Sequence, residues 1–139
     1  MGRISTLTCL LLVTVTAVTA QTKKPAAATG RLAKGQALYK QHCMSCHQEN
    51  GSGVPRMNPP LIKTEYVLGD KNRLISVLLK GLNEEVEING DYYSNPMPSQ
   101  AALKDEEIAD ILTYVRSSFG NKASAVAPAD VKKVRATIQ

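Results

Sequence analysis

Apolar residues recur at helical spacing in three stretches of the chain, at positions 32–43, 71–82 and 105–118. Before the second stretch, Asp70 can cap the first turn, and Gly81 lies near its end. The third stretch begins with three acidic residues and has Arg116 near its end, an arrangement that the helix dipole favours. The pattern predicts three main helices.

The segments between these stretches carry few signals for regular structure. A short helical turn is expected over 64–68. Asn89 and Gly90 predict the tight turn of a small hairpin over 88–92, because both accept a positive φ. Pro128 suits a first helical position and permits a short helix near the end of the chain. The predicted class is therefore all-α with long loops.

The first twenty residues have the features of a secretory signal peptide. Arg3 gives a positive start, the run 8–19 is apolar or hydroxylic, and small residues precede a cleavage point after Ala20. The apolar run is shorter than the ~20 residues that a membrane span needs. We therefore expect export to the periplasm, cleavage after Ala20, and no stable membrane span in the mature chain.

The mature chain divides into three parts by composition. Residues 21–30 are rich in Pro, Ala and Lys without apolar periodicity, which predicts a flexible leader. The helical patterning defines one domain over 31–121. Residues 122–139 form a C-terminal extension rich in Ala, Val and Lys.

Composition and charge limit the class of protein and the kind of partner further. The chain is 43% hydrophobic and 21% charged, which is typical of a globular protein. It has five Tyr, one Phe and no Trp, so an apolar cofactor would supply core volume that large rings do not. After cleavage, 16 Lys and Arg stand against 12 Asp and Glu, and this net charge of +4 would steer the chain toward an acidic partner. Nucleic acid is not an expected partner.

The candidate chemistry is concentrated in the motif Cys43-x-x-Cys46-His47. This spacing suits covalent haem attachment, in which each thiol adds to one haem vinyl group and His47 gives a nitrogen ligand to the iron. A thioredoxin-like disulfide would need a βαβ context that the chain lacks. A zinc site would need about four ligands, and besides this motif the mature chain offers only the adjacent His42 as a further His or Cys.

Two methionines are candidates for the iron ligand opposite His47. Met57 lies ten residues after His47, in a loop that must cover the same side of the haem. Met97 lies in an Asn-Pro-Met-Pro segment, whose prolines stiffen an extended backbone. A thioether on a rigid loop suits a soft axial ligand, so we expect Met97 to be the ligand. The alternative is that Met97 is an ordinary core residue.

The region from Arg31 to Asn121 resembles the class I cytochromes c. The match extends beyond the haem motif. Gly35 and Tyr39 match the family's small and aromatic pair on its first helix, and Ile111 and Tyr114 match the pair on its last helix. In the family these two helices cross closely, and the glycine permits the approach of their backbones.

The resemblance also implies how the iron is surrounded. Pro59 and Leu61 match the family's Pro-x-Leu, in which the proline carbonyl accepts a hydrogen bond from the proximal histidine. Met97 and Pro98 match its distal ligand loop. The implied site is one haem c bound covalently by two cysteines, ligated by a histidine and a methionine, and packed against Pro59 and Leu61. Its residues are Cys43, Cys46, His47, Met97, Pro59 and Leu61.

The resemblance implies a class I cytochrome c fold, with three main helices and long loops around one covalently attached haem. The implied function is periplasmic transfer of single electrons and not enzymatic catalysis, because His/Met ligation leaves no easily opened coordination site. The alternative is a dedicated haem subunit of a periplasmic dehydrogenase or terminal oxidase or reductase. A haem sensor or peroxidase would require loss of the Met97 ligand. We expect Lys40, Arg56 and Lys63 to flank the exposed haem edge and to favour an acidic docking surface on the partner.

Overall fold

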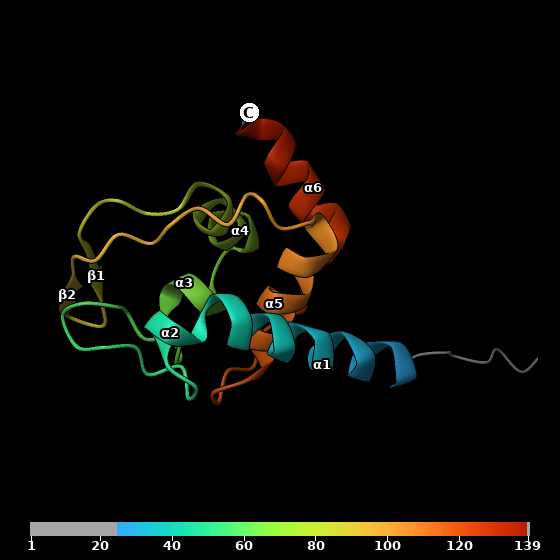
Figure 1. The fold of residues 1–139 in the computed structure, drawn as a ribbon, viewed down its shortest axis with the longest axis horizontal. Helices are drawn as coiled ribbons and strands as arrows, with labels where there is room; N and C mark the ends of the chain where they lie inside the picture. Colours follow the sequence, from blue (N-terminus) through green and yellow to red (C-terminus); the bar gives the residue numbers. More distant parts are fainter. Residues whose placement is uncertain (1–24, 139) are drawn as a thin grey trace, which may run out of the picture.

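The computed structural model describes residues 25–138. Within that range the chain forms six helices and a two-stranded antiparallel sheet (Figure 1). The helices are α1 (Pro25–His42), α2 (Met44–His47), α3 (Glu65–Leu68), α4 (Lys71–Lys80), α5 (Asp105–Ser117) and α6 (Pro128–Thr137). The strands are β1 (Val86–Ile88) and β2 (Asp91–Tyr93). The predicted helical class is confirmed.

The structure tests only part of the predictions for residues 1–30. The signal peptide over 1–20 and residues 21–24 of the leader lie outside the described residues. From Pro25 on, the segment predicted as a flexible leader is helical and belongs to α1, so that part of the prediction is wrong. A proline at a first helical position followed by alanines favours a helix, which explains the difference. Among residues 25–138, no helix is both long and apolar enough to cross a bilayer.

The helices α1 and α5 cross at close range because residue 35 is glycine. A Cβ atom at Gly35 would overlap the carbonyl of Asp110 on α5 and would lie 2.8 Å from the Cβ atom of Tyr114. The Arg31 guanidinium joins the same two helices by an ion pair of 2.5 Å to the Asp110 carboxylate. The close crossing expected from Gly35 is therefore present (Figure 1).

Three of the chain's few aromatic rings gather beside this crossing. The ring centroids lie 5.5 Å apart for Tyr39 and Tyr114, 5.4 Å for Tyr39 and Phe119, and 5.7 Å for Tyr114 and Phe119. Burial raises the pKa of the Tyr39 hydroxyl, which donates a 2.6 Å hydrogen bond to the Gln48 carbonyl. Tyr39 thus links the core to the turn that follows α2.

The ends of α4 follow from local chemistry. The Asp70 carboxylate accepts a 2.7 Å hydrogen bond from the backbone N–H of Arg73, so the predicted N-cap is confirmed. The helix ends at Lys80 and not at residue 82, because Gly81 adopts φ +76° and turns the chain away.

The hairpin spans residues 86–93, whereas the sequence predicts 88–92. It begins two residues earlier and ends one residue later than predicted. Asn89 and Gly90 form its turn with φ values of 55° and 87°. In the register, Val86 faces Tyr93 and Glu87 faces Tyr92. Tyr93 is buried and Tyr92 is exposed, so the sheet has an inner apolar face and an outer polar one.

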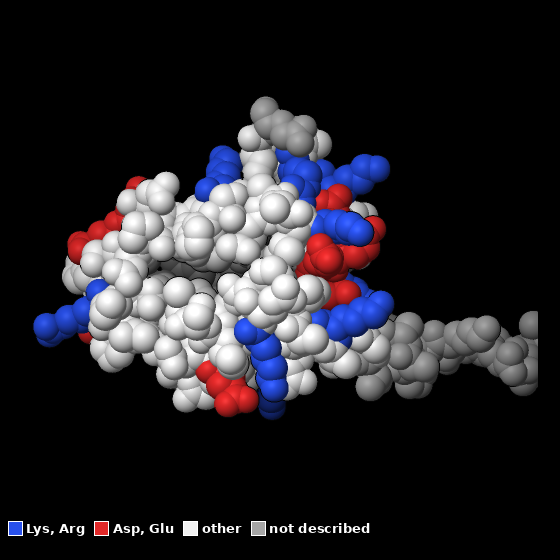
Figure 2. All heavy atoms as spheres, in the orientation of Figure 1, with Lys and Arg blue, Asp and Glu red and all other residues white. Residues whose placement is uncertain are grey.

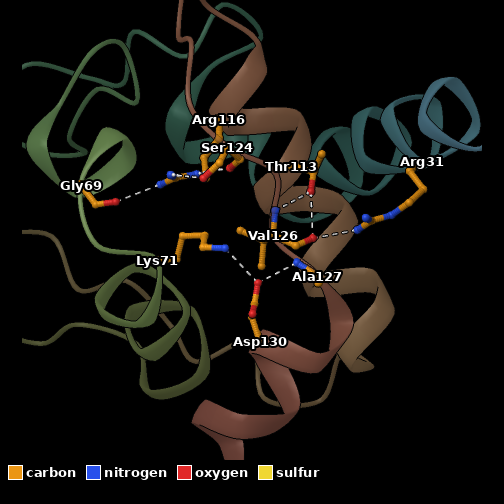
Figure 3. A network of polar contacts seen from close by, with 9 residues as sticks. All are labelled: Arg31, Gly69, Lys71, Thr113, Arg116, Ser124, Val126, Ala127 and Asp130. Atoms are coloured by element: carbon orange, nitrogen blue, oxygen red, sulfur yellow. Dashed lines mark hydrogen bonds and ion pairs between the residues drawn. The ribbon is translucent and has the colours of Figure 1, made fainter. Parts of the chain in front are cut away.

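The C-terminal extension contains the short helix that Pro128 permits, and it is an integral part of the fold. Helix α6 packs against α5 and α4 (Figure 1), and Val126 and Val131 are fully buried. Figure 3 shows the polar contacts that hold it. The Thr113 hydroxyl and the Val126 backbone exchange two hydrogen bonds of 3.2 and 3.1 Å, and Lys71 on α4 pairs with Asp130 on α6 at 3.1 Å.

Arg116 ties the extension to the rest of the molecule (Figure 3). Its side chain comes from α5 and is buried, with 3% of the residue exposed. It donates hydrogen bonds to the carbonyls of Val67 at 2.5 Å, Gly69 at 3.3 Å and Ser124 at 2.7 Å. One guanidinium thus joins α3, the start of α4 and the extension.

We expect Arg116→Lys to lower the free energy of unfolding by about 2–3 kcal/mol, because one ammonium cannot reach all three carbonyls and leaves buried acceptors without donors. Arg56→Lys is the control, since Arg56 is exposed and its side chain makes none of the described hydrogen bonds or ion pairs. This control should change the free energy by less than about 0.5 kcal/mol. Equal changes in denaturant unfolding of the two holoproteins would show that Arg116 has no special role.

The crossing of α1 and α5 gives a second prediction. Gly35→Ala should lower the free energy of unfolding by about 1–3 kcal/mol, because the added methyl overlaps the backbone of α5. Gly30→Ala on the same helix is the control, since nothing lies within 4 Å of a Cβ at that position. The control should be neutral or stabilise by up to ~1 kcal/mol through helix propensity. Thermal unfolding of both variants tests the prediction, which fails if both behave alike.

Candidate haem site

A mostly apolar cavity lies among α2, α4, α5, the hairpin and the segment that joins β2 to α5. Figure 2 shows a hollow between these elements on one face of the molecule. The helices contribute buried aliphatic side chains, and the inner face of the hairpin contributes Val86, Ile88 and Tyr93. The aliphatic residues of the helices include Leu74, Leu78, Ile111, Leu112 and Val115.

His47 lines this cavity at the end of α2. Its residue is 9% exposed, and its Nδ1 lies 2.9 Å from the carbonyl oxygen of Pro59. Because a carbonyl can only accept a hydrogen bond, the proton of the neutral ring lies on Nδ1, and Nε2 keeps a lone pair for a metal. The bond to Pro59 implied by the resemblance is thus present.

Burial favours the neutral form of His47. It lowers the pKa of the imidazole, because the charged form would lose its hydration, and the bond to the Pro59 carbonyl opposes this shift only in part. A neutral imidazole is the form that binds a metal ion.

Cys43 and Cys46 line the same cavity, with Cys43 directly before α2 and Cys46 within it. Their thiols are free, with Cys43 partly buried and Cys46 exposed. Burial, and to a lesser degree Cys46, raises the pKa of the Cys43 thiol to about 11. Hydrogen bonds of 3.2 and 2.9 Å from the N–H groups of Cys46 and His47 to the Cys43 carbonyl close the turn. The turn therefore brings both thiols and the imidazole to one wall.

The loop after α2 is folded back onto the end of α5. The N–H of Leu61 donates to the Gly51 carbonyl at 2.7 Å, and Leu61 lines the cavity beside Pro59. Asn121 donates to the Leu61 carbonyl at 2.9 Å and accepts from the N–H of Lys63 at 2.7 Å. Asn121 is thus a positioning residue for this loop. Its role has no local signal in the sequence, because its partner Leu61 lies sixty residues earlier.

The two candidate methionines have different surroundings. Met97 is partly buried, lines the cavity and packs against the hydrophobic core. It lies on the stretch between β2 and α5, which runs above α2 in Figure 1. Met57 is 49% exposed and is not among the residues that line the cavity. Only Met97 therefore shares the cavity with His47.

The predicted basic residues do not lie on the cavity wall. Lys40, Arg56 and Lys63 are exposed, and none of them is among the lining residues of the described cavity. Lys40 lies 3.9 Å from the carboxylate of Glu49. In Figure 2 the surface around the hollow is mainly uncharged. Their role in guiding a partner stays a prediction.

The residues present fit a covalently attached haem. An apolar cavity accepts the faces of a porphyrin, two thiols stand on one wall, and an imidazole with a free lone pair lies next to them. Among residues 25–138, no group of three or more His, Cys, Asp or Glu side chains is arranged to hold a metal ion. An imidazole and a thioether that line one cavity are donors that suit an iron held by a porphyrin.

Comparison with known proteins agrees with this chemistry. The sequence model of the cytochrome c family matches residues 32–119. The chain is 41% identical to cytochrome c-552 of Thermus thermophilus over 113 residues, which cover 75% of this chain and 86% of that relative. It is 35% identical to the cytochrome c subunit of alcohol dehydrogenase (quinone) from Gluconacetobacter polyoxogenes and 36% identical to the fructose dehydrogenase cytochrome subunit of Gluconobacter japonicus. Those two matches each cover 22% of the relative.

The fold, the motif on the cavity wall and the extent of the match lead to one conclusion. The chain belongs to the cytochrome c family, whose members bind a covalent haem c and transfer electrons.

Proposed function

We propose that this chain is an exported electron carrier that passes single electrons through one haem c with His47 and Met97 as axial ligands. The observation on which this depends is that both side chains, and both motif cysteines, line one apolar cavity. Bound in this cavity, the haem supplies an iron that changes between the ferrous and ferric states by one electron.

Each residue of the site has a distinct part in this proposal. Cys43 and Cys46 form thioether bonds that keep the haem in place. Pro59 orients the imidazole of His47 through its carbonyl and raises the basicity of Nε2. Leu61 and the aliphatic side chains of α4 and α5 exclude water from the iron.

A His/Met pair suits an electron carrier. Both ligands are neutral, so they favour reduced iron more than an anionic thiolate would. Both coordination positions are filled, so a substrate has no open site. These features support electron transfer and speak against a haem sensor or peroxidase.

A separate carrier is favoured over a subunit of a larger enzyme. The cytochrome c-552 of Thermus thermophilus is matched over 86% of its length, whereas the dehydrogenase cytochrome subunits are matched over 22%.

The sequence features of the signal peptide support export to the periplasm and cleavage after Ala20. The excess of Lys and Arg, including Lys40, Arg56 and Lys63, supports a redox partner with an acidic docking surface.

Covalent attachment is tested by extraction. Haem should stay with the denatured wild-type chain in acidic organic solvent, because thioether bonds survive unfolding. Cys46→Ala should release part of the haem or fail to mature. Ser45→Ala, on the same turn, should retain the haem completely. If the wild type releases all its haem, the attachment at Cys43 and Cys46 is wrong.

The axial ligand is tested by exchanging the two methionines. Met97→Ala should abolish the weak near-infrared charge-transfer band of ferric iron bound to a thioether, and should allow carbon monoxide to bind the ferrous protein. Its reduction potential should fall by a fraction of the ~0.8 V that axial ligands span. Met57→Ala, at the exposed position, should change none of these properties. The opposite pattern would assign Met57 as the ligand.

A further inference from the structure

The segment that carries Met97 completes the C-terminal end of α4. The last carbonyl groups of a helix have no partner within that helix. Here the Ser99 hydroxyl donates to the Leu79 carbonyl at 2.6 Å, and the N–H of Gln100 donates to the Leu78 carbonyl at 2.8 Å. The segment therefore caps α4 from outside.

The backbone of Met97 itself is held from the same side. Its N–H donates to the Leu82 carbonyl at 2.7 Å, and the N–H of Leu82 donates to the Met97 carbonyl at 2.9 Å. These two bonds form an antiparallel bridge just beyond the end of α4. Met97 is thus fixed by a bridge at its own position and by two bonds from the residues that follow.

Gly81 is the residue that lets the helix end and the Met97 segment meet. It has φ +76°, which glycine adopts at little cost. A Cβ atom there would lie 2.5 Å from the carbonyl oxygen of Met97 and 2.8 Å from the nitrogen of Ser99. Any larger side chain would therefore push the segment away from α4.

We propose that Gly81 and Ser99 are positioning residues for the Met97 thioether, which they hold at the iron by docking its segment onto the end of α4. This inference rests on the proposed function, in which Met97 is an axial ligand. Helix α4 also supplies Leu74, Val77 and Leu78 to the cavity wall. One helix thereby forms the apolar wall and fixes the ligand beside it.

The physical reason is preorganisation. A segment already held in its bound geometry loses little conformational entropy when the sulfur binds. If the segment detaches from α4, that entropy opposes the iron–sulfur bond and the open form becomes more populated. Weakening the contact between this segment and α4 should therefore weaken the bond of Met97 to the iron, while the thioether bonds and the His47 ligand remain.

The first experiment compares two glycines with similar backbone conformations. Gly81→Ala and Gly90→Ala both place alanine at positive φ, +76° and +87°, but nothing lies within 4 Å of a Cβ at Gly90. In the holoproteins, Gly81→Ala should lose the near-infrared band of the ferric form and bind carbon monoxide readily when reduced. Gly90→Ala should keep the band and resist carbon monoxide as the wild type does. Haem staining on a denaturing gel should show covalent haem in both.

The second experiment removes the Ser99 hydroxyl, which donates to the Leu79 carbonyl and accepts a 3.2 Å hydrogen bond from the backbone N–H of Ala101 in its own segment. Ser99→Ala should raise the rate of carbon monoxide binding to the ferrous protein about fivefold, the factor that corresponds to the one hydrogen bond that joins the segment to α4. Ser99→Thr keeps the hydroxyl and should restore the wild-type rate. Ser94→Ala is the matched control, because Ser94 is exposed on the same segment and its side chain makes none of the described hydrogen bonds.

The outcomes separate this inference from the proposed function. If the wild-type protein lacks the near-infrared band and binds carbon monoxide at once, both the proposed function and the positioning role are overturned. A wild type with the band, together with unchanged bands and rates in Gly81→Ala and Ser99→Ala, would overturn the positioning role and leave the ligation intact. If Gly81→Ala yields no holoprotein, the test is the rate of carbon monoxide binding in Ser99→Ala and Ser99→Thr, compared with the rate in Ser94→Ala. An unchanged rate in Ser99→Ala then overturns the positioning role.

Discussion

The crossing of α1 and α5 at Gly35 is the constraint on which the rest of the structure depends. It sets the position of α1, whose end leads into the turn with Cys43 and His47. It equally sets the position of α5, which lines the cavity on one side and binds the C-terminal extension on another. A change in the distance between these two helices would therefore move His47, the apolar wall and the extension together.

Helix α4 connects the C-terminal extension with the segment that carries Met97. Its N-terminal turn is held to α6 through Lys71 and Asp130, and its last carbonyls are bound by the segment after Met97. None of the described residues of the extension, 122–138, lines the cavity, yet its helix α6 packs on α4 and α5, which do. It therefore supports the cavity wall from outside, a part that its composition of Ala, Val and Lys does not reveal.

Local signals in the sequence predicted the features that depend on neighbouring residues. The cap at Asp70, the turn at Asn89 and Gly90, and the haem motif each lie within a few positions and follow from backbone geometry or covalent chemistry. Matching the family also identified the close approach at Gly35 and the bond to Pro59.

Contacts between distant segments could not be predicted in this way. Arg116 reads as a favourable charge near a helix end, but it is buried against the carbonyl of Val67, 49 residues earlier. Gly81 reads as a helix stop, and only the structure shows that it also faces Met97. Such roles depend on which segments meet in space, and a single sequence with its local periodicity does not contain that information.

The bridge between Leu82 and Met97 has a consequence for how this fold tolerates change. It closes the chain at the base of the hairpin, so the residues between the two bridge positions form a separate loop. Lengthening such a loop costs little, since closure entropy grows slowly with its length. Insertions or deletions at the turn of Asn89 and Gly90 can therefore reshape the outer rim of the cavity while the distance between the bridge residues stays constant. The hairpin is a site where sequence length can vary independently of His47 and Met97.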